Sequence, residues 1–269
     1  MGGELKEKVA QGVAWSMAEK IGSMLLAMAV RLIILRLLTR DILGFMSIPS
    51  AVVTVLLVIV DSGFSQSLVR HKGPSQSDYK SVFLFNIAVS AVLYGVLVAL
   101  APLAARWDGM PEIARIAPVF FLLLPLNALC AVQNTIFIRQ FRFALLSKVT
   151  FLSSLAGGLT AIALAMAGWG IWSLVAERVI AVGMRTALLW WLSDWRPCGK
   201  CGLKPLREMA PFGCSLMVTD LISNFYNKIP QFFLGKLYSP AVLGSFDQAV
   251  KLKDMPAATG IQAVQNVTF

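Results

Sequence analysis

The chain alternates between long apolar runs and short polar connections, and this pattern sets the expected fold. The first apolar run extends from Val13 to Leu38, and a second run follows from Ile42 after a short turn. Runs of about 20 apolar residues are long enough to cross a bilayer as helices. The pattern therefore predicts an all-α, polytopic membrane helix bundle. The predicted spans are residues 13–38, 42–62, 81–105, 113–137, 146–167, 170–192, 208–236 and 241–269.

The composition supports this interpretation. The chain has 269 residues, of which 57% are hydrophobic and 14% are charged, and its mean hydropathy is +0.72. Soluble domains carry about 25% charged residues, so the composition excludes a soluble domain of this size. Lys6 and Lys8 precede the first run as they would in a signal peptide. That run continues through Leu38, beyond the ~7–15 apolar residues of a signal sequence, so we expect an uncleaved first span.

Lysine and arginine outnumber acidic residues by 24 to 14, and they lie mainly in the connections between the apolar runs. This placement indicates membrane topology, and we expect no nucleic-acid partner. Basic residues are concentrated in the connections on the N-terminal side, so the positive-inside rule predicts a cytoplasmic N-terminus. The N-terminal side carries Lys6, Lys8, Arg70, Lys72, Lys80, Arg139, Arg142, Lys148, Arg196, Lys200, Lys204 and Arg207. The opposite side carries Arg40, Arg106, Arg115 and Lys236.

The start of the chain recurs about 200 residues later. The offset is 201 residues at the start of the repeated unit and 200 at its end. The matching positions are Gly12 and Gly213, Glu19 and Asp220, and Gly44 and Gly244. An even number of spans separates the two copies, so both enter the membrane from the same face. This is the pattern of a parallel repeat, with halves related by an axis along the membrane normal.

The repeat predicts how the chain is divided. We expect a complete six-helix transmembrane bundle over residues 1–195 and a basic cytoplasmic linker over residues 196–207. Residues 208–269 then form the first two helices of a second, incomplete bundle. Because the sequence stops at Phe269 inside or just after the eighth span, we expect the chain to be truncated.

Charged residues inside the spans mark candidate sites. Glu177 and Arg178 lie roughly 12 Å into the sixth span at 1.5 Å per residue, where charges normally face a bundle interior or an aqueous cavity. Arg178 and Arg185 are seven residues apart and share one helix face, which suits an anionic headgroup. Structural pairing of Glu177 and Arg178 with neighbouring helices is the alternative. Lys20, Arg31 and Arg36 lie nearer the ends of the first span, where snorkelling to the interface is expected.

The seventh span carries a polar stripe at helical spacing. Its residues are Asp220, Asn224, Asn227, Lys228 and Gln231. The opposite face is apolar, so the stripe predicts a wet cavity or a polar helix interface. Pro230 in this span, and Pro118 and Pro125 in the fourth, each remove a backbone hydrogen bond and favour a kink. Asp61 ends the second span, where we expect it to cap the following turn or to pair with a loop cation.

Motifs of enzymes are missing. The chain has no P-loop and no glycine-rich dinucleotide fingerprint, and its one histidine, His71, lies in a connection. Cys198 and Cys201 form a C-x-x-C pair without the further ligands that a zinc site needs, so unpaired loop thiols are the preferred interpretation. We therefore expect a protein that is not an enzyme and that has no catalytic residues, metal site or cofactor.

Short motifs along most of the chain carry a family resemblance. They are Gly12-Val13-Ala14-Trp15, Leu37-Leu38-Thr39-Arg40-Asp41-Ile42-Leu43-Gly44-Phe45, Asp61-Ser62-Gly63-Phe64, Ser67-Leu68-Val69, Arg142-Phe143, Gly170-Ile171-Trp172-Ser173-Leu174-Val175 and Leu243-Gly244-Ser245-Phe246. The chain resembles the polysaccharide and oligosaccharide flippases of the multidrug/oligosaccharidyl-lipid/polysaccharide exporter superfamily. Within that superfamily it is most similar to O-antigen and exopolysaccharide flippases.

The resemblance implies two six-helix bundles that face each other across a central cavity, in the bacterial inner membrane. It also implies movement of an undecaprenyl-pyrophosphate-linked glycan unit to the periplasmic leaflet for lipopolysaccharide or exopolysaccharide synthesis. The implied partners are this lipid-linked substrate, membrane lipid and a polysaccharide polymerase or export machinery. The candidate cavity residues are Arg178, Arg185, Lys228, Asp220, Asn224, Glu177 and Arg31. The family often has an aspartate where this chain has Asn227-Lys228, which puts an ion-coupling role there in doubt.

Two other functions remain open. A drug or cation antiporter of the same superfold would need an acidic, aromatic cavity, and the basic residues Arg178, Arg185 and Lys228 argue against it. A membrane scaffold for a glycan polymerase would transport nothing. Export measurements on cavity variants separate these hypotheses.

Overall fold

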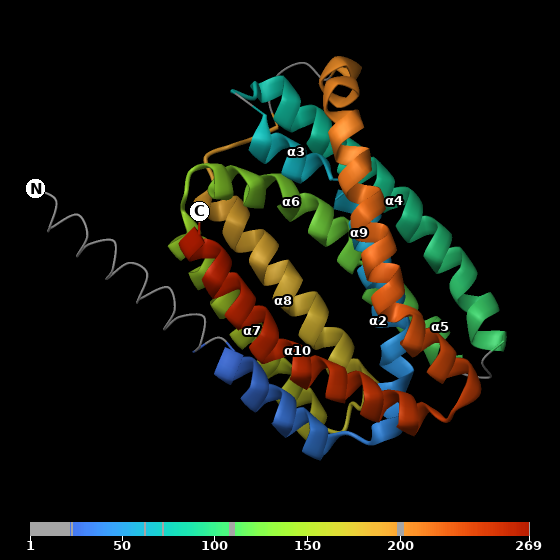
Figure 1. Ribbon diagram of the computed structural model, residues 1–269. Helices are drawn as coiled ribbons and strands as arrows, with labels where there is room; N and C mark the ends of the chain where they lie inside the picture. The colour runs from blue at the N-terminus through green and yellow to red at the C-terminus, as the bar shows by residue number, and fades with distance from the viewer. Residues whose placement is uncertain are drawn as a thin grey trace, which may run out of the picture.

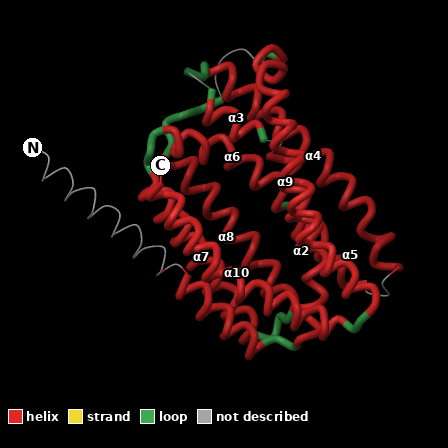
Figure 2. The backbone as a smooth tube through the Cα atoms, viewed as in Figure 1, coloured by secondary structure: helices red, strands yellow, loops and turns green. Residues whose placement is uncertain are grey.

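The computed structural model describes residues 22, 24–61, 63–71, 73–107, 111–197 and 202–268, and the described chain folds as a bundle of helices (Figure 1). Helices joined by short loops make up nearly all of the tube in Figure 2, as the all-α prediction requires. The first helix covers residues 24–37. The helices that follow are α2 (Arg40–Asp61), α3 (Phe64–Arg70), α4 (Gln76–Trp107), α5 (Pro111–Phe121), α6 (Leu123–Arg139), α7 (Phe143–Met166), α8 (Ile171–Leu192), α9 (Leu203–Leu237) and α10 (Pro240–Thr268).

Three details differ from the prediction. The fourth span is divided at Leu122 into α5 and α6. Pro125 lacks the N–H that would bond the carbonyl of Phe121, so the helix is interrupted where the proline predicts. Helix α9 continues through Pro230 and begins at Leu203, inside the segment expected to be a linker. The short helix α3 was not predicted, because its seven residues are too few for a periodic signal.

Four segments of the described chain are long and apolar enough to cross a membrane. They are Arg40–Asp61, Gln76–Leu103, Ala114–Arg139, which contains the break at Leu122, and Phe143–Met166. Helix α8 has a similar length but carries Glu177, Arg178 and Arg185. The apolar segments make this chain a multi-pass membrane protein.

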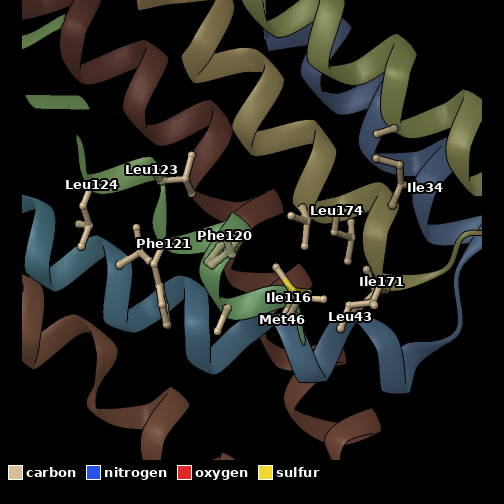
Figure 3. Close-up of a cluster of buried hydrophobic side chains, with 14 of the residues drawn as sticks. Ile34, Leu43, Met46, Ile116, Phe120, Phe121, Leu123, Leu124, Ile171 and Leu174 are labelled. Atoms are coloured by element: carbon tan, nitrogen blue, oxygen red, sulfur yellow. The ribbon is translucent and has the colours of Figure 1, made fainter. Parts of the chain in front are cut away.

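The main apolar core joins the first helix, α2 and α4 to α8. Figure 3 shows Ile34, Met46, Phe120 and Leu174 converging from four of these helices. Ile34 is 0% exposed and Phe120 is 2% exposed. This packing fixes α8 beside the first helix, and it thereby fixes the side chains that α8 directs into the interior.

The turns before α2 and α10 have the same local structure at an offset of 200 residues. The amide of Leu38 donates to the carbonyl of Ile34 at 2.9 Å, and the amide of Tyr238 donates to that of Leu234 at 2.9 Å. One turn later, the amide of Leu43 donates to the backbone carbonyl of Thr39 at 3.3 Å. The corresponding bond, from Leu243 to Ser239, is 3.2 Å long. The predicted repeat therefore has matching backbone conformations at both turns.

The same two turns pack against each other. A Cβ atom added to Gly44 would lie 1.9 Å from the carbonyl oxygen of Pro240. A Cβ atom added to Gly244 would lie 2.4 Å from the carbonyl oxygen of Arg40. Because residues 40 and 240, and 44 and 244, are equivalent in the repeat, the contact is reciprocal. Such reciprocity is what a local two-fold relation between α2 and α10 produces.

Candidate functional site

Charged side chains gather between the first helix, α8 and α10. A cavity of about 450 Å³ is lined by Arg31 of the first helix, Glu177 and Arg178 of α8, and Lys251 of α10. The same four side chains line a narrow adjoining cavity of about 20 Å³, which also contacts Gln248. Three of the predicted candidates, Arg31, Glu177 and Arg178, therefore lie together, although they come from helices far apart in the sequence.

Arg31 does not snorkel, so that expectation is wrong for this residue. Its side chain is 7% exposed, and its Nε donates a hydrogen bond to Oε1 of Gln248. The acceptor on α10 keeps the guanidinium inside the bundle. Arg36, one turn and a half further along, is exposed. Lys20 lies outside the described residues.

Close packing of α7 against α8 positions Glu177 and Arg178. A Cβ atom on Gly157 of α7 would lie 2.5 Å from the carbonyl oxygen of Glu177, so only glycine allows this approach. Among the described residues, the salt bridges join Lys251 to Asp247 and Lys253 to Asp254. Within that part of the chain, neither Glu177 nor Arg178 is in a salt bridge. Both side chains line the cavities, with Glu177 half-buried and Arg178 exposed.

Arg185 lines a different cavity from the one that Arg178 lines, although both residues lie on one face of α8. This second cavity has a volume of about 230 Å³ and is also lined by Asp61, Ser65, Asn127 and Asn134. Nη2 of Arg185 donates to Oδ1 of Asn134 at 3.0 Å, while its Nε is buried without a partner among the described residues. Asp61 accepts a hydrogen bond from the hydroxyl of Ser65 in α3. This bond joins two side chains, and the N-cap of α3 is Gly63, which has no side-chain cap bond.

The three candidates on α9 line neither of these cavities. Nε2 of Gln66 donates to Oδ2 of Asp220 at 3.4 Å. The side-chain Nδ2 of Asn224 donates to the backbone carbonyl of Asp220 at 2.8 Å. Lys228 is half-buried. The stripe turns fully inward only at Gln231, which is 3% exposed. The apolar face is outward, since Phe233 of that face is 63% exposed.

Sequence reasoning missed the polar residues of α10. Nε2 of Gln231 donates to Oδ1 of Asp247 at 2.8 Å, and the ammonium of Lys251 pairs with Oδ2 of the same carboxylate. Asp247 is 2% exposed and Gln248 is 5% exposed. An Asp and a Lys four residues apart within an apolar run were a usable signal, because such a pair can share one buried face. Cys198 and Cys201 lie outside the described residues.

The fold and the cavity define a multi-pass helical membrane protein with a charged interior site. Comparison with known proteins then identifies its family. The chain belongs to the family described as polysaccharide biosynthesis protein, whose model matches residues 33–269. No solved structure matches the chain.

Two curated relatives cover nearly the whole chain. It is 25% identical over 262 residues to the succinoglycan biosynthesis transport protein ExoT of Rhizobium meliloti (strain 1021), covering 97% of this chain and 53% of the relative. It is 22% identical over 271 residues to an uncharacterized membrane protein in the cps region of Klebsiella pneumoniae, covering 98% and 55%. The chain therefore spans about half the length of the curated relatives it matches.

Proposed function

We propose that this chain is part of a transporter that flips undecaprenyl-pyrophosphate-linked oligosaccharide units from the cytoplasmic to the periplasmic leaflet of the bacterial inner membrane. The product serves polysaccharide biosynthesis and export. The observation that carries the proposal is the interior cavity shared by Arg31, Glu177 and Arg178 within an apolar bundle. The family description and the transport function in the name of one relative support it.

The chemistry of the cavity suits the polar end of such a substrate. Placing a charged side chain at the centre of a bilayer costs ~2.5–3.5 kcal/mol or more, so interior charges are retained where a pathway uses them. Arginine guanidinium groups bind phosphate oxygens through several parallel hydrogen bonds. The carboxylate of Glu177 accepts hydrogen bonds from sugar hydroxyls. A pyrophosphate-linked sugar supplies both kinds of group.

The orientation of transport rests on the charges of the connections. The N-terminal side of the bundle carries the basic connections, so we place that side in the cytoplasm. On this placement the cavity lies nearer the opposite face, because Glu177 and Arg178 are about eight residues from the connection at Trp169.

The test is export by cells that carry variants of the full-length protein. We expect Arg31→Gln with Arg178→Gln to reduce polymer export roughly 10-fold or more, because two charged contacts to the phosphates are lost. Arg36→Gln is the matched control, since Arg36 lies on the same helix as Arg31 but is exposed. Protein levels in isolated membranes are measured for each variant.

Two results would count against the proposal. Equal export by the double variant and by the Arg36→Gln control would remove the cavity from the transport pathway. A deletion strain that exports no polymer and yet accumulates no lipid-linked intermediate would favour the scaffold hypothesis instead.

A further inference from the structure

Helix α10 adds a cation to the interior site that neither the repeat nor the family resemblance indicates. Lys251 lines both the larger and the narrow cavity, together with Arg31 and Arg178. The three cations come from three different helices. Two of these belong to the first bundle, whereas α10 belongs to the second copy of the repeat.

A chain of hydrogen bonds from α9 holds Lys251 in place. Gln231 of α9 donates to one oxygen of Asp247, and Lys251 pairs with the other oxygen. The side chain of Asp247 is 3% exposed, whereas that of Lys251 is 27% exposed. The carboxylate is therefore a fixed buried anchor. The ammonium group has three donors, and its pairing with Asp247 leaves others for the cavity.

The charges around the site leave an excess of positive charge. The charged side chains that line the two cavities are Arg31, Glu177, Arg178, Lys251 and Asp254. Asp254 forms a salt bridge with Lys253 at 3.4 Å, and its side chain is 60% exposed, so this pair is neutral. Three cations then face two acids, Glu177 and the anchoring Asp247. A cavity lined by more cations than acids favours an anionic ligand.

We propose that Lys251 contacts the phosphate groups of the transported molecule together with Arg31 and Arg178, and that Asp247 and Gln231 are positioning residues for it. This inference rests on the proposed function and adds a contact from α10. A bound pyrophosphate then bridges the first bundle and α10, so that substrate occupancy joins the two halves of the repeat through one anion.

The experiment measures binding by calorimetry to the purified full-length protein in a neutral detergent. The probes are inorganic pyrophosphate, farnesyl pyrophosphate and phosphatidylglycerol. We expect Lys251→Gln to weaken binding of both pyrophosphates roughly 10-fold to 100-fold, the range of one charge-assisted hydrogen bond. Lys251→Arg should retain most of the affinity. Lys253→Gln is the matched control, because it removes the same charge from the same helix at a side chain that is 75% exposed.

A second variant separates ligand contact from a purely structural role. Lys251→Gln alone leaves Asp247 buried without its cation, which can destabilise the fold. Asp247→Asn combined with Lys251→Gln removes both charges, and we expect this pair to fold with binding still weakened. Wild-type affinity for pyrophosphate in the pair would overturn the assignment of Lys251.

The remaining outcomes also decide the question. Lysine-dependent binding of phosphatidylglycerol without binding of either pyrophosphate would assign the site to a membrane lipid and overturn the substrate contact. Loss of export in the Arg31 and Arg178 variants, with unchanged pyrophosphate affinity in Lys251→Gln, would leave the proposed function standing and refute only the role of Lys251.

Discussion

Replacing Gly44 by alanine places a methyl group against the backbone of α10. The new Cβ atom would lie 1.9 Å from the carbonyl oxygen of Pro240 and 2.5 Å from its carbonyl carbon. These atoms belong to the backbone, so no side-chain rotation relieves the contact. Helix α2 or α10 must move instead, and the reciprocal contact between Gly244 and Arg40 opens with it.

The size of the effect follows from the distances. Ordinary van der Waals contact begins near 3.4 Å, so the two backbones must separate by about 1.5 Å. Overpacking of this kind costs ~1–3 kcal/mol. Alanine gains about 1 kcal/mol over glycine inside a helix, which offsets part of the cost. We expect a net destabilisation of up to about 2 kcal/mol, or a decrease in Tm of up to roughly 8 °C at about 2–4 °C per kcal/mol.

The assay is thermal unfolding of the purified protein in detergent, with Gly95→Ala as the control. Gly95 lies in α4, and a Cβ atom there meets nothing within 4 Å. The control should therefore match or exceed the wild-type Tm. Gly44→Ala combined with Gly244→Ala should cost less than the sum of the single changes, because one separation of the helices relieves both contacts.

The result that would refute this reasoning is equal stability of Gly44→Ala and Gly95→Ala. It would mean that α2 and α10 do not approach through their glycines. Strict additivity of the two alanine substitutions would contradict the reciprocal contact, even if each substitution alone were destabilising.

Two further substitutions test the packing around α6. Gln133 is 0% exposed, and both of its polar side-chain atoms lack partners among the described residues. An unpaired buried amide costs about 1–3 kcal/mol, so Gln133→Leu should raise Tm. Arg139 donates through Nη1 to the carbonyls of Val69 at 2.9 Å and His71 at 2.8 Å. Arg139→Ala should lower Tm and increase hydrogen exchange at the end of α3, whereas Arg142→Ala, with an exposed side chain, should do neither.

The helices could be predicted because their signal is local. A run of apolar residues of membrane length is sufficient to indicate a helix in a bilayer, and the turn before Gly44 recurs recognisably before Gly244. The break at Leu122 also has a local cause, the proline at position 125. Each of these features depends on residues a few positions apart, so the sequence contains the relevant interactions.

The site could be predicted only in part, because its contacts join distant segments. The depth of Glu177 and Arg178 in the sixth span identified them as candidates, and both line the charged cavities. The hydrogen bond of Arg31 to Gln248 spans 217 residues, so no local pattern distinguishes it from snorkelling. Likewise, Arg178 and Arg185 line different cavities because of how α8 packs against its neighbours. This packing depends on residues distant in the sequence.

The two copies of the repeat are related by local symmetry, but residues that differ between them make the charged site near α10 asymmetric. Arg31 and Gln231 are equivalent positions at an offset of 200 residues, and both donate to α10, to the neighbouring residues Gln248 and Asp247. The α2 copy has no such acceptors. In place of Asp247, Gln248 and Lys251 it has Ser47, Ile48 and Ala51.

The counterpart interface, between α9 and α2, is accordingly apolar. It borders a cavity of about 290 Å³ whose lining includes Ile48, Gly235 and Leu243. One equivalent pair of helices thus borders a charged cavity, and the other borders an apolar one. A lipid-linked glycan also has a charged end and an apolar end. The polarity difference between the two copies therefore matches the polarity difference within the proposed substrate, which a strictly symmetric repeat could not provide.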